Sequence, residues 1–404
     1  MGRVFKAGAL SLAVLLGYLL FWPVQIEPYR WTPQQDPGLT GPFVPNDDLA
    51  AAEPVFLAQD GGGLPAGVKL GRDVFARGPE DVALGPDGWF YSGIHFVEDP
   101  HHPHFMRDGA IVRTQPQTEE VQALAFTGGR PLGVEFDTSG NLYVCDAIKG
   151  LLRVSAAGEV ERVGPNPGTS ENPDYTDNLD ISDDGVVYFS SPSMRWALSQ
   201  IRLDGMETRP TGRLLSYDPR TDHIKQELGE LMFANGVVLG PGDAYALVAE
   251  WYGYRITRKW LKGPKKGTRE TFIDNLPGYP DNLSIDDEGT IWVGLVIPRD
   301  AVVDRLQSHP FLIKVLARIP ESLQPHPKRI GWLLGFDEDG KLRYNLQDAN
   351  LRGLDLDNDF DLEQLFYYRI TGAKKLDEAL ILTSDLTPKY GRLALPPRAW
   401  QREP

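Results

Sequence analysis

A repeated strand-turn-strand pattern constrains this chain more than any other feature. Each copy has an apolar or oxygen-bearing start, a short strand, a Gly-containing turn, and a second strand with an aromatic residue near its beginning. The turn glycines stand at positions 88, 140, 185, 242 and 289, so the turns recur about every 45 to 57 residues. This period fits four-stranded propeller blades and exceeds that of the common helical repeats. A weaker copy at residues 368–383 keeps the strand and loses the turn. We therefore predict an all-β fold, a six-bladed β-propeller over residues 47–404.

The interval between the fifth and sixth copies is about twice as long as the others, and its excess lies at about residues 299–320. Apolar residues recur there at helical spacing and are interrupted by Pro310, which predicts two short amphipathic helices. We place this helical insertion between the fifth and sixth blades. Three roles fit it: a cap over the mouth of the ring, a contact with a membrane surface, or a peripheral packing element.

The amino terminus begins with a basic tip that contains Arg3 and Lys6, followed by an uncharged run over residues 7–26. A run of this length can span a bilayer, and the basic flank places its start in the cytoplasm. No small-residue cleavage site follows, so we predict a retained transmembrane anchor over residues 1–26. The rest of the chain would then lie on the periplasmic or lumenal side. Residues 27–46 are rich in Pro, Gly and Gln and are predicted to form a linker without a core of its own.

The composition excludes some partners. Forty-one Lys and Arg against 56 Asp and Glu give a formal charge of −15, which disfavours nucleic acid and suits cations or neutral substrates. The acidic residues are spread thinly, so solubility alone also explains them. Cys145 is the only cysteine, so no intramolecular disulfide can form, and its strand-like surroundings favour a core residue over a catalytic thiol.

Oxygen-bearing side chains begin the innermost strands of four predicted blades. These are Glu80, Asp177 or Asn178, Asn235 and Asp281. In a propeller such positions converge on the axis at one end of the channel, so residues distant in sequence become neighbours. Carboxylate and amide oxygens without His or Cys suit calcium better than zinc. Turn capping by Asp and Asn is the simpler explanation, but the recurrence of an oxygen ligand at one blade position favours a metal site.

Several blocks of the sequence carry a family resemblance. They are Gly129–Val134, Leu142–Val154, Phe233–Val238, Trp260–Gly267 and Asp274–Asn282. Together they resemble strictosidine synthase-like proteins, among them the adipocyte plasma membrane-associated proteins, which also carry an amino-terminal anchor. More distant similarity extends to gluconolactonases of the senescence-marker-protein family and to paraoxonases. The resemblance covers roughly residues 70–396 and implies a six-bladed propeller with calcium in its channel and hydrolytic activity on esters or lactones.

The resemblance also implies roles for individual residues. Glu80, Asn235 and Asp281 match the metal positions of the gluconolactonases, and the counterpart of Asp281 acts there as both ligand and base. A fourth ligand is an Asn before an Asp in those enzymes, whereas this chain has the reverse order, Asp177-Asn178. Paraoxonases use a histidine near calcium, which makes His95 a candidate base. His95 belongs to a stretch with His101, His102 and His104 that is otherwise typical of a solvated loop.

These observations predict a membrane-anchored, calcium-dependent hydrolase of the arylesterase or lactonase type. Its partners would be a small ester or lactone, the Ca²⁺ ion and the membrane. A propeller in which calcium only stabilises the channel and the rim binds a ligand or protein is the alternative. Strictosidine synthase chemistry is disfavoured, because it requires a glutamate in the last blade and no acid stands at residues 368–371.

Overall fold

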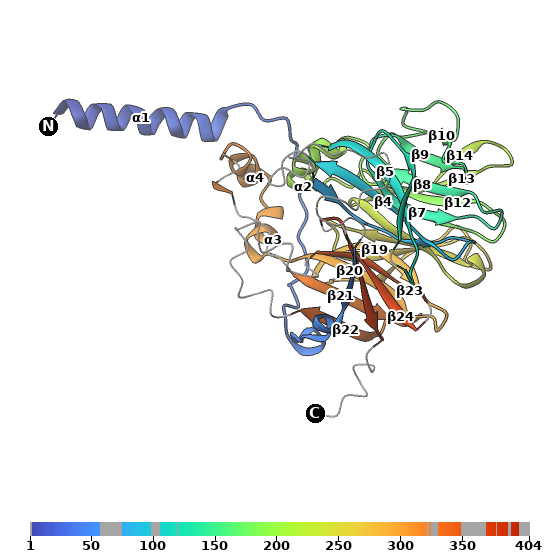
Figure 1. The fold of residues 1–404 in the computed structure, drawn as a ribbon. Helices are drawn as coiled ribbons and strands as arrows, with labels where there is room; N and C mark the ends of the chain where they lie inside the picture. Colours follow the sequence, from blue (N-terminus) through green and yellow to red (C-terminus); the bar gives the residue numbers. More distant parts are fainter. Residues whose placement is uncertain are drawn as a thin grey trace.

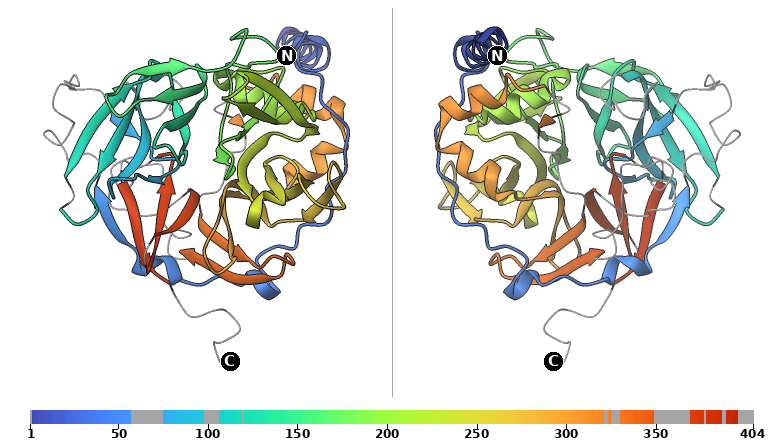
Figure 2. Two further views of the ribbon diagram at one scale, coloured as in Figure 1. Left: turned by 90° about the vertical axis from the view of Figure 1, so that its right-hand side faces the viewer. Right: turned by 90° about the vertical axis from the view of Figure 1, so that its left-hand side faces the viewer.

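The computed structural model describes residues 2–56, 75–97, 106–118, 120–320, 323–324, 330–348, 369–376, 378–386 and 389–395. Within these residues, antiparallel strands form six sheets arranged around a central axis (Figures 1 and 2). The predicted six-bladed β-propeller is therefore confirmed. Large apolar clusters fill the spaces between neighbouring blades. One of them joins Leu247 and Ile256 of the fourth blade to Val293 and Trp332 of the fifth.

Each of the first three blades is a sheet built from a continuous stretch of chain. The first contains β2 (Phe75–Arg77), β3 (Ala83–Leu84), β4 (Phe90–Val97), β5 (Met106–Thr114) and β6 (Val121–Phe126). The second contains β7 (Pro131–Phe136), β8 (Leu142–Asp146), β9 (Gly150–Val154) and β10 (Val160–Arg162). The third contains β11 (Leu179–Ile181), β12 (Val187–Ser191), β13 (Gly212–Asp218) and β14 (His223–Leu231).

The fourth and fifth blades are also continuous in sequence. The fourth contains β15 (Ala234–Leu239), β16 (Tyr245–Glu250), β17 (Arg255–Trp260) and β18 (Arg269–Ile273). The fifth contains β19 (Gly278–Ile285), β20 (Ile291–Pro298), β21 (Gly331–Phe336) and β22 (Leu342–Asp348). The turns between their inner two strands fall at the predicted Gly242 and Gly289, which have positive φ values of 63° and 78°.

The sixth blade combines strands from the amino-terminal and the carboxyl-terminal parts of the chain. Its inner strands are β23 (Ile370–Leu376), β24 (Ala379–Ser384) and β25 (Lys389–Ala394). Its outermost strand is β1 (Glu53–Phe56), which pairs antiparallel with β25 and places Val55 opposite Tyr390. The ring is thus closed by backbone hydrogen bonding between segments more than 300 residues apart, a pairing that the repeat pattern did not indicate.

Strand direction gives the two ends of the channel different characters. Innermost strands begin at one end, and the Gly-containing turns that follow them lie at the other. The end where the innermost strands begin also carries α2 (Ile201–Glu207), α3 (Ala301–Gln307) and α4 (Pro310–Leu316) (Figure 1). We call this end the helical face and the other end the turn face.

Helices α3 and α4 form the predicted helical insertion, but the prediction of its place among the blades was wrong. They lie between β20 and β21, inside the fifth blade, and not between the fifth and sixth blades. Sequence spacing alone could not separate these two positions, because the outer strands of a blade carry no turn signature of their own. Within the described residues, the short 3₁₀ helices are η1 (Gly41–Phe43), η2 (Asp48–Ala51), η3 (Leu198–Gln200) and η4 (Pro241–Asp243).

The amino-terminal segment starts with α1 (Gly2–Phe21), which projects away from the helical face (Figure 1). None of the helices in the described part of the chain combines the length and apolar character that crossing a membrane requires.

The predicted linker, residues 27–46, packs against the propeller. Tyr29 donates its backbone N–H to the Glu207 carbonyl at 2.8 Å, and Arg299 donates to the Gln34 carbonyl at 2.6 Å. The Trp31 ring lies beside the Tyr254 ring, with centroids 6.0 Å apart. Residues 27–46 therefore follow the surface of the propeller from α1 to β1.

Candidate metal centre

Six residues on an innermost strand or just before it, one from each blade, line a cavity of about 90 Å³ at the helical face. They are Glu80, Arg130, Asp177, Asn235, Asp281 and Arg369. The shared position follows from the repeat, because the same step in each blade brings the chain from the outer rim to the axis. Four of the six are the predicted metal-binding residues Glu80, Asp177, Asn235 and Asp281.

The three acids among these residues form a tight cluster. Carboxylate oxygens of Glu80, Asp177 and Asp281 lie within 4.8 Å of one another, and all three side chains are buried. Close blade packing contributes to this convergence. A Cβ atom at Gly236, next to Asn235, would overlap the backbone oxygen of Asp281, so the glycine lets the fourth and fifth blades approach here.

The oxygens of this cluster suit a cation. Asp177 Oδ1, Asn235 Oδ1 and Asp281 Oδ1 are buried and accept no hydrogen bond from any described residue. Buried polar atoms are normally satisfied, because an unpaired one costs roughly 1–3 kcal/mol. Three carboxylates and one amide oxygen without nitrogen or sulfur ligands form a hard donor set that fits calcium. The residues present therefore fit the ion that the sequence predicts.

Ionisation of these three neighbouring acids is unfavourable in the absence of a bound cation. Burial raises the pKa of Glu80 to about 7, and the Arg130 guanidinium opposes this rise. Burial and the negative charge of Glu80 raise the pKa of Asp177 and of Asp281 well above the usual range. Such shifts arise when like charges share a desolvated site, and a nearby positive charge reverses them.

The two arginines bring positive charge to the same cavity. Arg130 Nη2 lies 3.8 Å from Glu80 Oε2 and 3.7 Å from Asp385 Oδ2, and Arg369 Nε lies 3.0 Å from Asp385 Oδ1. The contacts of Arg130 are longer than hydrogen bonds, and its buried Nε has no hydrogen-bond partner among the described residues. Arg130 therefore offers donors to a group inside the cavity.

Comparison with known proteins identifies the family. The strictosidine synthase family model matches residues 177–264, and the model for the N-terminal part of strictosidine synthase-like proteins matches residues 67–95. Human adipocyte plasma membrane-associated protein is 30% identical over 377 residues, which cover 86% of this chain and 83% of that protein. The chain belongs to the strictosidine synthase-like family. The Arabidopsis thaliana protein STRICTOSIDINE SYNTHASE-LIKE 6 is 33% identical over 244 residues, covering 59% of this chain and 62% of that protein.

Among solved structures, a gluconolactonase from Xanthomonas campestris, XC5397, has a TM-score of 0.52 and 13% sequence identity. The match covers 85% of this strictosidine synthase-like chain and 95% of the bacterial one. At this identity the likeness concerns the fold alone.

Asn178 is not part of the cluster in this strictosidine synthase-like chain, and its prediction as a ligand was wrong. Its side-chain oxygen accepts a hydrogen bond from the Val237 N–H at 2.9 Å, and its amide nitrogen lies 3.4 Å from Asp81 Oδ2. Successive side chains of an extended strand point to opposite sides, so Asp177 and Asn178 cannot both reach one ion.

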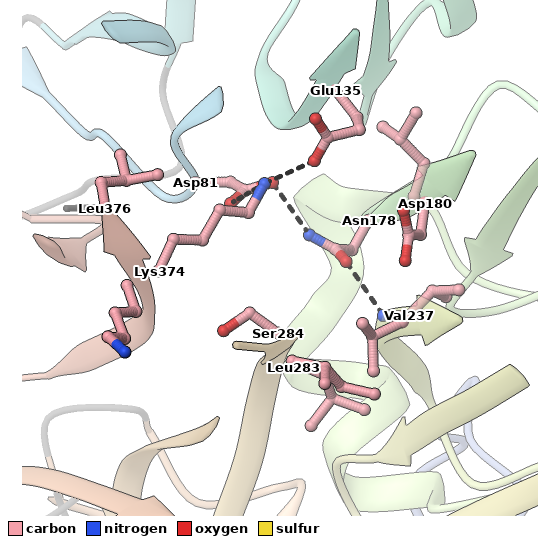
Figure 3. A pocket seen from close by; sticks show the side chains of 13 residues that line it. Asp81, Glu135, Asn178, Asp180, Val237, Leu283, Ser284, Lys374 and Leu376 are labelled. Carbon is pink, nitrogen blue, oxygen red and sulfur yellow. Dashed lines mark hydrogen bonds and ion pairs between the residues drawn. The ribbon is translucent and has the colours of Figure 1, made fainter. Parts of the chain in front are cut away.

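Asn178 instead lines a second cavity, of about 220 Å³, on the side of the turn face (Figure 3). This cavity contains the ion pair between Lys374 Nζ and Glu135 Oε2, 2.7 Å apart, and Asp81 Oδ1 lies 3.6 Å from the same nitrogen. It is larger than the first cavity, but two of its acids, Asp81 and Glu135, already have Lys374 as a partner.

His95, the other predicted catalytic residue, is buried in β4, opposite Arg77 and Gly109 of the neighbouring strands. It is not among the residues that line the carboxylate cavity or the larger cavity on the side of the turn face. Its neighbours Ile94 and Phe96 pack toward the sixth blade, so strand alternation points His95 to the other side of the sheet. The lining of the carboxylate cavity thus does not include His95, and its role as a base stays a prediction. His101, His102 and His104 lie outside the described residues.

Sequence reasoning missed Arg130, Arg369 and Asp385. The signal for the two arginines was present, since each stands at the blade position that supplies the ligands. An arginine side chain has no oxygen atom, so a pattern of oxygen-bearing residues does not include these two positions. Asp385 follows β24, and no periodic pattern marks that position.

Proposed function

We propose that this chain is a calcium-dependent hydrolase of esters or lactones. The observation that carries the proposal is the cluster of three buried carboxylates, in which Asp177 Oδ1 and Asp281 Oδ1, like the neighbouring Asn235 Oδ1, accept no hydrogen bond from a described residue. The fold similarity to a gluconolactonase supports it, because a hydrolase with this architecture exists.

Glu80, Asp177, Asn235 and Asp281 would hold the ion. When bound, calcium would supply Lewis-acid polarisation of a substrate carbonyl. Apolar and aromatic side chains surround the charged groups and limit their contact with bulk water: Leu132, Tyr175, Leu198, Ile201, Phe233, Trp251 and Leu386. Exclusion of water strengthens every electrostatic interaction within the site.

Asp281 is the residue we assign to proton transfer. Its Oδ1 accepts no hydrogen bond from a described residue and can therefore accept one from a water molecule. Asp281 can act as a base only in the carboxylate form, which burial and the neighbouring acids disfavour and Arg369 favours. Arg130 would donate hydrogen bonds to an oxygen that becomes negatively charged during the reaction.

We also propose that α1 attaches the protein to a membrane with the propeller on the extracytoplasmic side. Two observations support this: the run without charged residues after Lys6, and the name of the human relative, which describes it as associated with the plasma membrane.

The decisive experiment is hydrolysis of phenyl acetate and of a simple lactone by the purified chain, with calcium and with a chelator. We expect turnover that the chelator abolishes and added calcium restores. Turnover that is indifferent to the chelator would contradict the role of the ion. Calcium-dependent melting without turnover of either substrate class would favour the non-catalytic alternative.

A further inference from the structure

The helical face exposes apolar side chains beside the base of α1. On α4, Phe311 is 56% exposed and Leu312 is 44% exposed, whereas Ile313 between the helix and the propeller is buried. On α3, Val302 is 55% exposed. Adjacent large apolar residues on an outward helical surface commonly mark an interaction site.

Helix α1 is fixed to this face by specific contacts. Arg318, which follows α4, donates to the carbonyls of Trp22 at 2.6 Å and Leu19 at 3.1 Å. Ile26 is buried against Trp196 and Ile313. Because these contacts hold the last turn of α1, the direction in which the helix leaves the propeller is set by the fold.

The direction of α1 indicates which side of the propeller would face a surface that α1 contacts. Helix α1 points outward from the same side that carries α2, α3 and α4 (Figure 1), and the view from that side shows these helices in front of the ring (Figure 2, right). A flat surface that touches α3 and α4 would therefore also receive α1.

The occupant of this face follows from the character of α1. Beyond Lys6 its exposed residues carry no charge, and large apolar ones stand on several sides of the helix, among them Leu10, Leu12, Val14, Leu15 and Leu16. A protein partner usually covers one stripe of a helix, whereas a helix that is apolar all round requires an apolar medium. Lipid supplies that medium.

Aromatic and basic residues around the base of α1 agree with a lipid surface. Tyr18 and Trp22 form a ring pair with centroids 5.8 Å apart, and Trp22 is 61% exposed. Tyr and Trp are enriched at the boundary between water and hydrocarbon. Arg305 of α3 and Lys314 of α4 add positive charge, which attracts anionic lipid headgroups.

We propose that α3, α4 and the last turn of α1 form a docking face for the lipid bilayer that α1 enters. The carboxylate cavity lies on the same side of the ring, and residues Leu198 of η3 and Ile201 of α2 form part of its lining. Docking would orient the opening of the carboxylate cavity toward the lipid. If the proposed hydrolase function is correct, on which this second step rests, the substrates are apolar esters or lactones dissolved in the membrane.

A fluorescent thiol label tests the docking. Cys145 is fully buried, so an introduced surface cysteine is labelled selectively. We would place an environment-sensitive dye at Phe311→Cys and, as a matched control, at Leu84→Cys. Leu84 is 48% exposed and precedes the first-blade turn, on the turn face. Both full-length proteins are mixed with vesicles of phosphatidylcholine and phosphatidylserine.

The dye at position 311 should shift to shorter emission wavelengths and be quenched by spin-labelled lipid, while the dye at position 84 remains unchanged. Equal and unshifted spectra on vesicles that have bound the protein would show that α1 alone makes the contact and would overturn the proposal. A failure of the protein to bind the vesicles at all would also overturn it.

Activity then separates docking from catalysis. The double variant Phe311→Glu/Leu312→Glu should lose roughly tenfold in the hydrolysis of a vesicle-dissolved ester, because its contact area with lipid is reduced. Its activity on water-soluble phenyl acetate should stay the same, and Leu84→Glu should match the unmodified protein on both. Equal activity of all three proteins on the vesicle-dissolved ester would refute the substrate assignment. A shifted label without any turnover would instead refute the hydrolase function and leave the docking face standing.

Discussion

At the scale of single residues, the charged side chains that five of the six blades bring to the axis define this molecule. Glu80, Asp177 and Asp281 place three acids in one buried cluster, while Arg130 and Arg369 enter the same cavity from the second and sixth blades. Burial makes each acid dependent on a nearby positive charge. A change at one of these positions should therefore affect function far more than an equal change elsewhere on the helical face.

Replacement of Asp281 tests this directly. Asp281→Asn keeps the shape of the side chain but removes the negative charge and the ability to accept a proton. We expect kcat/KM for ester hydrolysis to fall by about 10²–10⁴-fold. The control is Asp204→Asn, which removes another buried acid of the helical face that does not line the cavity. Comparable activity in the two variants would exclude Asp281 from catalysis.

Asp204 makes a separate prediction about pH. Burial raises its pKa to about 7 from an ordinary value of 3.8. Because the folded pKa is the higher one, Asp204 contributes stability fully below pH 4, and this contribution is lost as the pH rises toward 7. We compare the free energy of unfolding of Asp204→Asn with that of the unmodified protein. Relative to the unmodified protein, the variant should be more stable at pH 8 than at pH 4, by on the order of 1–3 kcal/mol. Denaturant midpoints at both pH values measure this difference, and a pH-independent difference would contradict the shift.

At the scale of elements, the amino-terminal segment is an integral part of the propeller. Strand β1 completes the sixth blade, and η2 inserts Leu49 into the core between the fifth and sixth blades, where it is fully buried. Asn46 donates a side-chain hydrogen bond to the Asn345 carbonyl at 2.8 Å and so fixes the approach to η2. The ring therefore depends on residues that precede its first blade.

Truncation of Leu49 measures that dependence. Leu49→Ala should lower the free energy of unfolding by about 2–5 kcal/mol, because it removes a large apolar side chain from a filled core. Leu39→Ala is the control within the same segment. Leu39 is exposed, so its replacement should change the free energy of unfolding only slightly. Chemical denaturation of both variants decides the matter. Equal midpoints would mean that the segment contributes no stability.

At the scale of the whole molecule, one ion would connect four blades. Glu80, Asp177, Asn235 and Asp281 belong to the first, third, fourth and fifth blades, so an ion at the axis would link sheets that otherwise meet only through neighbours. Without such a charge, the mutual repulsion of the acids opposes closure of the ring.

Calcium should therefore raise the melting temperature of the whole propeller. A calcium concentration a hundred times the Kd stabilises the native state by about 2.7 kcal/mol, provided that the unfolded chain does not bind the ion. Calorimetry with calcium and with chelator measures this effect. Asp281→Asn should reduce it strongly, and Asp204→Asn should leave it intact. A melting temperature that does not respond to calcium in the unmodified protein would refute the metal centre.

The sequence by itself determined the number of blades, the turns at Gly242 and Gly289, and the four side chains expected around an ion. These features are local or periodic: a turn needs a positive φ at one residue, and a repeated strand start returns to the axis in every blade. Strand alternation was also available in the sequence, and it already excludes Asn178 once Asp177 is placed at the axis.

Only the tertiary structure decided which strand closes the ring, where the helical insertion belongs, and that Arg130, Arg369 and Asp385 share the cavity with the acids. It also left His95 out of the lining of the carboxylate cavity and laid residues 27–46 against the propeller. Each of these depends on contacts between residues far apart in the chain, such as Val55 with Tyr390 or Gln34 with Arg299. Such contacts are set by packing and long-range hydrogen bonding, which leave no periodic trace in the sequence.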